Sequence, residues 1–310
     1  HYDRECKNCS ATLIEIITEK APSPKNIDVK MLDSAMEKWR NILKQEPDNA
    51  EANYALGLVY LNKQLRDAAI HHLRKASILV PEIAVIHYNL GVTLFGDESL
   101  LLTSQEYIDA KKEIDYAVDL DPTFPEAVGM KHLFLAMKLI NSEPQEAIKE
   151  YKFVIAAFPD IAIFYSNLAV CYTAIKDYDN AKKSCLKAIE MNPTESLFYA
   201  NLSSFFIRVK NYQDGLIYAK KALELLTPLT REDVKAQVYD TLGLCLYNTG
   251  QKEEAIKNIE KAIALNPKNP SYIKHLVMMG KIPVKLPQSS GCSSVLVLCF
   301  LLIFLIYLLT

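Results

Sequence analysis

The sequence predicts an all-α fold built from repeated pairs of helices. Only 9 of the 310 residues are glycine, and residues that favour helix, such as alanine, leucine, lysine and glutamate, are abundant instead. One stretch also recurs: "AEANYALGLVYLNKQLRDAAIHHLRKASILVPEI" (50–83) is matched by "AQVYDTLGLCLYNTGQKEEAIKNIEKAIALNPKN" (236–269). Self-similarity at a period of about 34 residues indicates stacked helix–turn–helix units, because one unit cannot bury its apolar face alone.

Each copy carries small, large and proline residues at matching places. Small residues let the two helices of a unit approach closely, large apolar residues fill the space between helices and units, and the proline cannot continue the second helix. In the first copy these residues are Leu56, Gly57, Tyr60, Ala69, Leu73, Ala76 and Pro81. In the second copy they are Leu242, Gly243, Ala255, Ile259, Ala262 and Pro267.

This pattern resembles the tetratricopeptide repeat. About six and a half units fit the register over 28–280, which implies a right-handed superhelical solenoid. The predicted units are a lone second helix at 31–49, then 50–83, a unit from 84 with extra residues near 96–102, a degenerate unit at 125–160, 162–195, 196–230, 236–269 and a closing helix at 270–280. The second helix of the 196–230 unit is expected to run on into 225–233.

The resemblance implies a concave groove, formed mainly by first helices, that binds peptides or partner helices. The corresponding positions are more apolar and aromatic than charged, which favours an amphipathic helix or an apolar peptide as partner. The alternative is that the N-terminal segment or the next repeat covers some of them. The groove positions are Tyr54, Leu58, Leu61, Tyr88, Val92, Phe95, Val170, Thr173, Ser204, Ile207, Arg208, Asp240, Leu244 and Tyr247.

A series of asparagines occupies one further position of the units: Asn89, Asn167 and Asn201. In some tetratricopeptide proteins such a series holds an extended peptide by its backbone, since an amide both donates and accepts hydrogen bonds. The alternative is hydrogen bonding between neighbouring repeats. The basic clamp of the chaperone-binding members is missing, because its positions hold Tyr54, Leu58, Asn89, Ile163 and Asn167.

Composition and motifs exclude several function classes. The formal net charge is -2, from 35 basic and 37 acidic residues, which argues against nucleic acid as a partner. No phosphate loop or nucleophile elbow is present. His71 and His72 are expected on a solvated face, and His87, His132 and His275 are isolated in the sequence. We therefore expect neither an enzyme nor a small-molecule substrate.

The cysteines form no disulfide pattern. Cys171, Cys185 and Cys245 lie in apolar helical stretches and are expected to be small buried side chains. Cys6 and Cys9, in the N-terminal segment 1–27, have the spacing of one half of a zinc knuckle. A structural zinc site needs four ligands. Zinc is therefore expected only if further ligands precede His1, and otherwise no cofactor is expected.

The stretch 294–310, "SVLVLCFLLIFLIYLLT", contains no charged residue. It is just long enough to span a bilayer as a helix, and a linker at 281–293 with two prolines precedes it. The nearest charges, Lys281 and Lys285, are on its N-terminal side, which favours repeats facing the cytoplasm. The segment resembles a tail anchor of a single-pass membrane protein. The alternative, a cleaved lipid-anchor signal near Ser290, would need a longer polar spacer.

Taken together, the sequence predicts a membrane-tethered adaptor that binds a protein or peptide partner in the concave groove. The alternative is a structural assembly subunit of a stable membrane complex.

Overall fold

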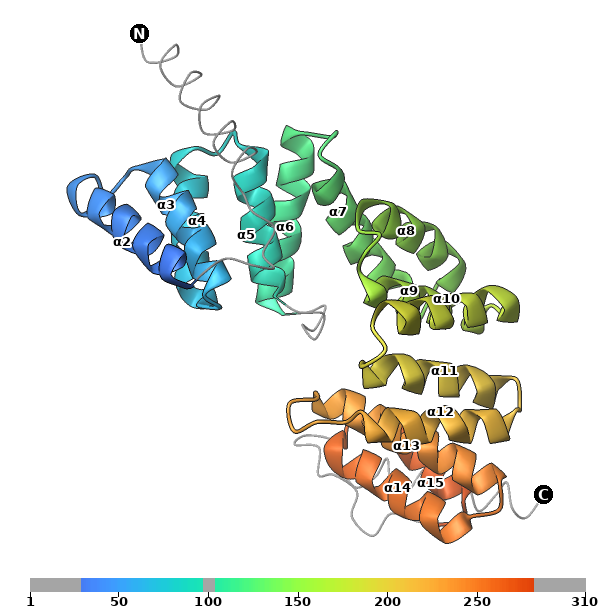
Figure 1. Cartoon of the computed structure of the whole chain (residues 1–310). Coiled ribbons are helices and arrows are strands. Elements are labelled where there is room, and N and C mark those ends of the chain that lie inside the picture. Colours follow the sequence, from blue (N-terminus) through green and yellow to red (C-terminus); the bar gives the residue numbers. More distant parts are fainter. Residues whose placement is uncertain (1–28, 97–103, 282–310) are drawn as a thin grey trace, which may run out of the picture. The chain divides into compact units, whose positions relative to one another are not determined.

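The computed structural model describes residues 29–96 and 104–281, and every regular element in these ranges is an α-helix (Figure 1). The predicted all-α class is confirmed for this part of the chain. The chain divides into two compact units, with the boundary between Asp177 and Tyr178.

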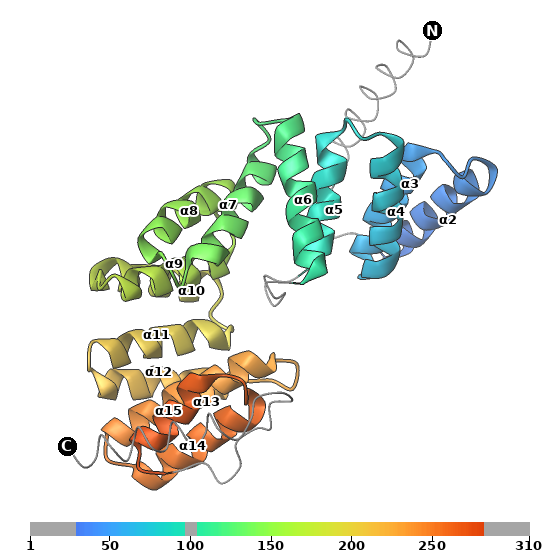
Figure 2. The ribbon, with the colours of Figure 1, turned by 180° about the vertical axis from the view of Figure 1, so that it is seen from behind.

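The first unit consists of helices α2 to α9, and each helix packs against the next in the chain. Three antiparallel pairs, α3–α4, α5–α6 and α7–α8, are visible from both sides (Figures 1 and 2). The helices are α2 (Val29–Gln45), α3 (Ala50–Asn62), α4 (Arg66–Leu79), α5 (Ala84–Phe95), α6 (Gln105–Leu120), α7 (Pro125–Leu139), α8 (Pro144–Ala157) and α9 (Ala162–Ala174).

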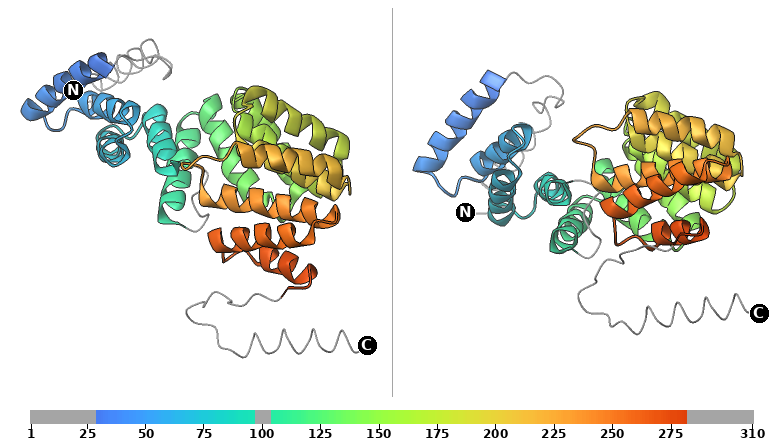
Figure 3. Two further views of the ribbon diagram at one scale, coloured as in Figure 1. Left: turned by 60° about the horizontal axis from the view of Figure 1, so that its bottom comes forward. Right: turned by 90° about the horizontal axis from the view of Figure 1, so that it is seen from below.

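The second unit consists of helices α10 to α15 and continues the same scheme. Each helix again packs against the next, as the stacked yellow-to-red helices show (Figure 3). Helix α11 also contacts α13, so that the first helices of consecutive pairs touch. The helices are α10 (Tyr178–Met191), α11 (Ser196–Arg208), α12 (Tyr212–Glu224), α13 (Glu232–Asn248), α14 (Lys252–Leu265) and α15 (Pro270–Met278). The predicted closing helix therefore exists as α15.

One predicted boundary is wrong. The second helix α12 ends at Glu224 instead of running on to residue 233, and α13 begins at Glu232, before the expected start at 236. Pro228 lies between them and has no N–H to donate to a preceding turn. The Thr227 N–H donates instead to the Thr230 hydroxyl (2.9 Å), which closes a local turn.

The turns inside several units share one backbone conformation. A residue just after the first helix adopts a positive φ, and the N–H of the residue after it bonds back to a carbonyl in the last turn, which is a Schellman C-cap. The positive-φ residues are Gln64, Lys176, Lys210 and Gly250. The bonds run from Leu65 to Tyr60, Asp177 to Tyr172, Asn211 to Phe206 and Gln251 to Leu246. Only one of the four positions is glycine, so this turn cannot be recognised from a glycine in the sequence.

The predicted close approach of paired helices is confirmed. A methyl group added at Gly57 would lie 2.8 Å from Leu73 Cγ, and one at Gly91 would lie 2.8 Å from Ile114 Cγ1. Gly243 faces Ile259 at the same distance. Each pair therefore packs a large side chain of the second helix directly on the backbone of the first.

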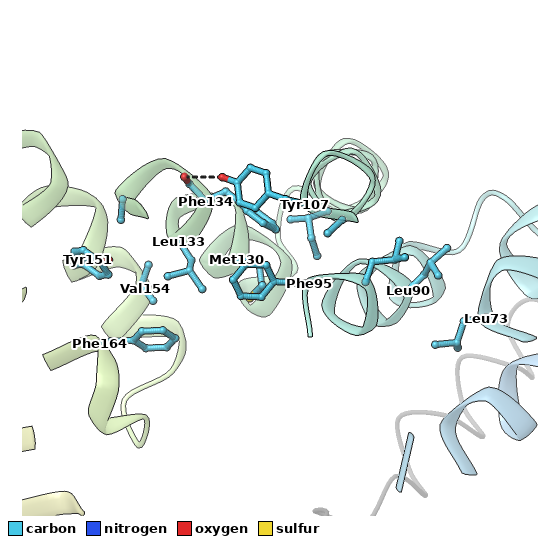
Figure 4. Close-up of a cluster of buried hydrophobic side chains, with 14 of the residues drawn as sticks. Leu73, Leu90, Phe95, Tyr107, Met130, Leu133, Phe134, Tyr151, Val154 and Phe164 are labelled. Atoms are coloured by element: carbon cyan, nitrogen blue, oxygen red, sulfur yellow. Dashed lines mark hydrogen bonds between the residues drawn. The ribbon is translucent and has the colours of Figure 1, made fainter. Parts of the chain in front are cut away.

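The core of the first unit is continuous across its pairs (Figure 4). At its centre the rings of Phe95 and Tyr107 both contact Phe134, with centroids 5.2 and 5.1 Å apart. The Tyr107 hydroxyl donates to the Phe134 carbonyl oxygen at 3.3 Å, and burial raises the pKa of this tyrosine. The second unit has its own core, which includes Leu216, Leu246, Ile259 and Leu276.

Several predictions lie outside the described residues. These are the zinc half-site at Cys6 and Cys9, most of the insertion near 96–102, the linker beyond residue 281 and the apolar segment 294–310. The single solenoid over 28–280 stays a prediction.

Candidate functional site

The predicted groove positions fall on the first helices of the pairs. In the first unit they lie on α3, α5 and α9, and in the second unit on α11 and α13. Most are partly exposed, as expected for a binding surface: Leu58, Leu61, Tyr88, Asn89, Val92, Asn167, Thr173, Asn201, Ser204, Ile207, Leu244 and Tyr247. Val170 and Arg208 are exposed, whereas Tyr54, Phe95 and Asp240 are buried.

The partly exposed residues form a stripe on each first helix. Leu58 and Leu61 are three residues apart, Tyr88 and Val92 four, and Leu244 and Tyr247 three, so each pair shares one helix face. The leucines at 56, 90 and 242 point the other way and are buried in the core. The stripe residues pack against the edge of that core with part of their surface still open. We call this set of partly exposed residues the first-helix stripe.

Tyr54 is held inside the first unit by a long-range hydrogen bond. It is 2% exposed, and the Asn89 side-chain amide donates to its hydroxyl at 2.7 Å. Burial raises the pKa of Tyr54 well above its usual range, and the hydrogen bond from Asn89 offsets part of that rise. Tyr54 therefore joins α3 to α5 and is not open for a ligand.

Tyr88 lies on the stripe and remains partly exposed. Its ring packs against Phe124, with centroids 4.9 Å apart. Burial and the nearby charge of Glu126 raise the pKa of Tyr88 to about 12, so the hydroxyl stays protonated and available as a donor at neutral pH. An aromatic ring with a polar tip is a common anchor in protein interfaces.

Two of the three asparagines of the predicted series connect neighbouring first helices. The Asn89 Nδ2 donates to Tyr54 and to the Val85 carbonyl oxygen (2.7 and 2.9 Å). The Asn201 Oδ1 accepts from Gln237 Nε2 at 2.6 Å, which links α11 to α13. Asn167 is partly exposed on α9. Bonding between neighbouring repeats, the alternative to peptide binding, is thus observed for Asn89 and Asn201.

The histidines that are isolated in the sequence each pair with a carboxylate. The Nδ1 atoms of His87, His132 and His275 lie 2.6, 2.5 and 2.7 Å from carboxylate oxygens. The partners are Glu113, Glu150 and Asp240. His87 also contacts the Pro81 carbonyl oxygen through Nε2 (3.0 Å), and His132 stacks on Phe153. Asp240 is 8% exposed, so its pairing with His275 removes it from the predicted groove and ties α15 to α13.

Two of these histidine–carboxylate pairs could have been recognised from the positions of their glutamates within the repeats. Glu113 and Glu150 both stand three residues after the small residue that opens the second-helix pattern, Ala110 or Ala147. His72 stands at the same distance after Ala69, and it bonds Asn53 on the first helix (3.0 Å). Comparison of equivalent positions between units, rather than of neighbours in the sequence, would have revealed this row of contacts between paired helices.

His72 corrects one expectation, because it is half-buried instead of solvated. Burial lowers the pKa of His72 to about 4, with smaller contributions from the charges of His71, Lys75 and Arg40. The unfolded chain binds a proton at His72 below about pH 6.5, whereas the folded chain does so only near pH 4. Unfolding therefore takes up a proton between these values, and stability falls as the pH falls.

We expect the urea midpoint of unfolding to decrease as the pH falls from about 6.5 to about 4. A His72→Gln variant, which keeps a donor for Asn53, should show a smaller decrease. His71→Gln should keep most of it, because burial is the larger cause of the pKa shift. Identical pH profiles for the His72 variant and the parent chain would contradict this account.

The three cysteines of the described helices are buried and free, as the sequence predicts. Burial raises the pKa of Cys171 and Cys185 to about 12 and that of Cys245 to about 11, so all three stay thiols at neutral pH. Within residues 29–96 and 104–281, no three His, Cys, Asp or Glu side chains gather as ligands for a metal ion. No helix in these same ranges has the length and apolar character needed to cross a membrane.

Comparison with protein families matches three stretches of the chain to the tetratricopeptide repeat: residues 32–82, 162–195 and 236–269. These matches confirm the predicted repeats at those positions. The first of them includes most of α2, and the other two coincide with the units expected from the sequence.

Curated relatives match about half of the chain. "BBSome complex member BBS4" from Bos taurus is 24% identical over 198 residues, which is 52% of this chain and 36% of that protein. The protein of the same name from Mus musculus is 25% identical over the same share. The match therefore spans little more than a third of the length of these relatives.

Solved structures share the fold at low sequence identity. A chain of the structure "APC/C hetero-tetramer Cut9-Hcn1" has a TM-score of 0.57 and 18% identity, covering 88% of this chain and 52% of that one. "Pseudomonas Aeruginosa pilF" has a TM-score of 0.52 and 18% identity, covering 74% and 97%. A likeness at this identity concerns the fold alone.

Proposed function

Because this chain carries tetratricopeptide repeats, we propose that it is a protein-binding adaptor whose first-helix stripe holds an amphipathic helix or an apolar peptide. The observation that supports it is the recurrence of partly exposed apolar side chains on α3 and α5 in the first unit, and on α11 and α13 in the second. A helix that enters a groove uses anchors three to four residues apart. The spacings of Leu58–Leu61 and Tyr88–Val92 offer matching contacts.

The stripe suits an apolar partner better than a charged one. The predicted groove positions include two charged residues, Arg208 and Asp240. Arg208 is exposed, whereas Asp240 is buried against His275. Tyr88 adds a ring for packing and a hydroxyl donor. Burying apolar surface of the partner supplies the affinity, and the hydroxyl contributes to orientation.

Site-specific photocrosslinking tests this proposal. A photoreactive residue at Leu58 or Val92 is expected to crosslink the same partner, since both lie on the stripe of the first unit, and one at Leu244 tests the stripe of the second unit by itself. Matched controls are Ile78 and Ile217, which are apolar and 72% and 63% exposed but lie on the second helices α4 and α12. Adducts of equal yield from the controls would contradict a role for the stripe.

Tyr88 is the residue whose loss should weaken binding most. Truncation of a central aromatic anchor costs about 2 kcal/mol or more, which is roughly a 30-fold rise in Kd. We expect Tyr88→Ala to show this rise in Kd when the variant is titrated with the partner that photocrosslinking has identified. The exposed Ile78→Ala should leave Kd unchanged. Circular dichroism would confirm that both variants stay helical.

The apolar segment 294–310 supports a second part of the proposal, that the repeats are tethered to a membrane and face the cytoplasm. Its composition and length suit a single bilayer span, and tethering raises the effective concentration toward partners on the same membrane. Deletion of residues 291–310 should release the chain from the membrane fraction at high salt. Retention of the shortened chain in that fraction would contradict tethering by this segment.

A structural assembly subunit is the second candidate. It is favoured by the name of the curated relatives, a member of the BBSome complex. Such a subunit would co-purify with its partners at fixed stoichiometry in high salt, whereas an adaptor would release a peptide partner on dilution.

A further inference from the structure

Helix α2 exposes side chains that are buried at the same positions of the other second helices. Ala35, Trp39 and Ile42 have the spacing of Ala69, Leu73 and Ala76 in α4. The three residues of α4 are 0% exposed, as are Ala110, Ile114 and Ala117 in α6 and Ala255, Ile259 and Ala262 in α14. In α2 all three are partly exposed.

The reason for this difference is the missing first helix. In α4 and α6 the middle residue packs on a glycine of the preceding helix, Leu73 on Gly57 and Ile114 on Gly91. Among the described residues, α2 instead packs on the helix that follows it, with Met36, Trp39 and Leu43 against Leu56 and Tyr60 of α3. The side of α2 that would meet its own first helix has no described partner.

Trp39 lies at the edge of this face, because part of its side chain packs on α3 and the rest is exposed. It is larger than the leucine or isoleucine at its position in α4, α6 and α14, and it is only partly buried. The Lys38 ammonium sits 4.6 Å from its ring centroid. An indole ring of this size buries much apolar area when it is covered, so the face favours an apolar partner helix.

We propose that residues 12–20, "TLIEIITEK", form the first helix of this pair and cover the face of α2 around Trp39. In the pairs α3–α4, α5–α6 and α7–α8 the first helix directly precedes the second in the chain. The 28 residues before α2 provide more than the 13 residues of α3 and a short turn. The covalent link keeps this segment at high effective concentration near α2.

The sequence of the segment fits the role. Thr12 and Glu15 have the spacing of a capping box, which favours a helix start. Leu13, Ile14 and Ile17 follow at the i, i+1, i+4 spacing of an apolar helix face. Pro22 and Pro24 come after this stretch, so they fall in the connection to α2 and do not interrupt the proposed helix.

The chain contains a single tryptophan, so its fluorescence reports on the surroundings of this one side chain. We propose to measure the emission maximum and acrylamide quenching of Trp39 in the full 310-residue chain, kept in a mild detergent. The double variant Ile14→Asp/Ile17→Asp should shift the emission to longer wavelength and increase quenching, because the charges prevent docking. The matched variant Thr12→Asp/Thr18→Asp carries the same charge at polar positions and should leave both values unchanged.

Two further outcomes overturn the proposal. If the Ile14/Ile17 variant leaves the emission unchanged but dilution of the parent chain shifts it, a second copy of the chain covers the face. If neither the Ile14/Ile17 variant nor dilution of the parent chain changes the Trp39 emission, the face is open or is covered by another protein. Far-ultraviolet circular dichroism and the urea midpoint separate loss of docking from general unfolding, because the helices from α4 onward should remain intact in the variant.

Discussion

Replacing Ile114 by alanine is expected to lower the free energy of unfolding of the first unit by about 2–5 kcal/mol. Ile114 is 0% exposed and packs directly on the backbone of α5 at Gly91. Removing its side chain loses buried apolar area and leaves a cavity that two closely packed helices cannot easily close. Urea unfolding followed by circular dichroism measures this change.

Ile108→Ala is the matched control, since Ile108 lies on the same helix α6 and is 50% exposed. The same substitution there should change stability by less than about 0.5 kcal/mol. Similar losses for the two variants would show that the core does not depend on the predicted repeat position.

The second prediction concerns the close approach of α7 and α8 at Gly129. A methyl group at Gly129 would lie 2.5 Å from the Ala157 Cβ and 2.8 Å from Phe158 Cε2. Gly129→Ala gains about 1 kcal/mol in helix propensity, but the Ala157 Cβ is fixed to its backbone and cannot move aside. We therefore expect a net destabilisation, with overpacking costs of about 1–3 kcal/mol.

A compensating substitution makes this prediction specific. Ala157→Gly removes the atom that clashes, so the double variant Gly129→Ala/Ala157→Gly should be more stable than the sum of the two single changes indicates. Ala156→Gly is the control, because Ala156 is exposed next to it and cannot relieve the contact. Additive effects in both double variants would contradict the close approach of α7 and α8.

Much of the fold was predictable from the sequence because the repeat is a local pattern. The small residues at 57, 91 and 243, the apolar residues opposite them and the prolines that end each unit recur at nearly constant spacing. Helix boundaries and close approach of paired helices follow from these positions. The predicted overrun of α12 failed because a turn around Thr227 and Thr230 depends on side-chain hydrogen bonding, which leaves no periodic signal.

The candidate site was predictable only in part. Position in the repeat correctly placed the stripe on first helices, but it could not show that Tyr54 and Asp240 are buried. Their partners, Asn89 and His275, stand 35 residues away. Gly129 likewise belongs to no repeat pattern, and its importance comes from the neighbouring end of α8.

The sequence by itself determined that the described part of this protein consists of helix pairs with an apolar stripe on the first helices, because local spacing decides which residues share a helix face. Only the tertiary structure decided which members of that stripe remain open. Burial and hydrogen bonding between residues on different helices depend on the distances between those helices, and these distances are set by packing across the whole unit. The same packing leaves Trp39 of α2 partly exposed, where the register alone would have placed a buried residue.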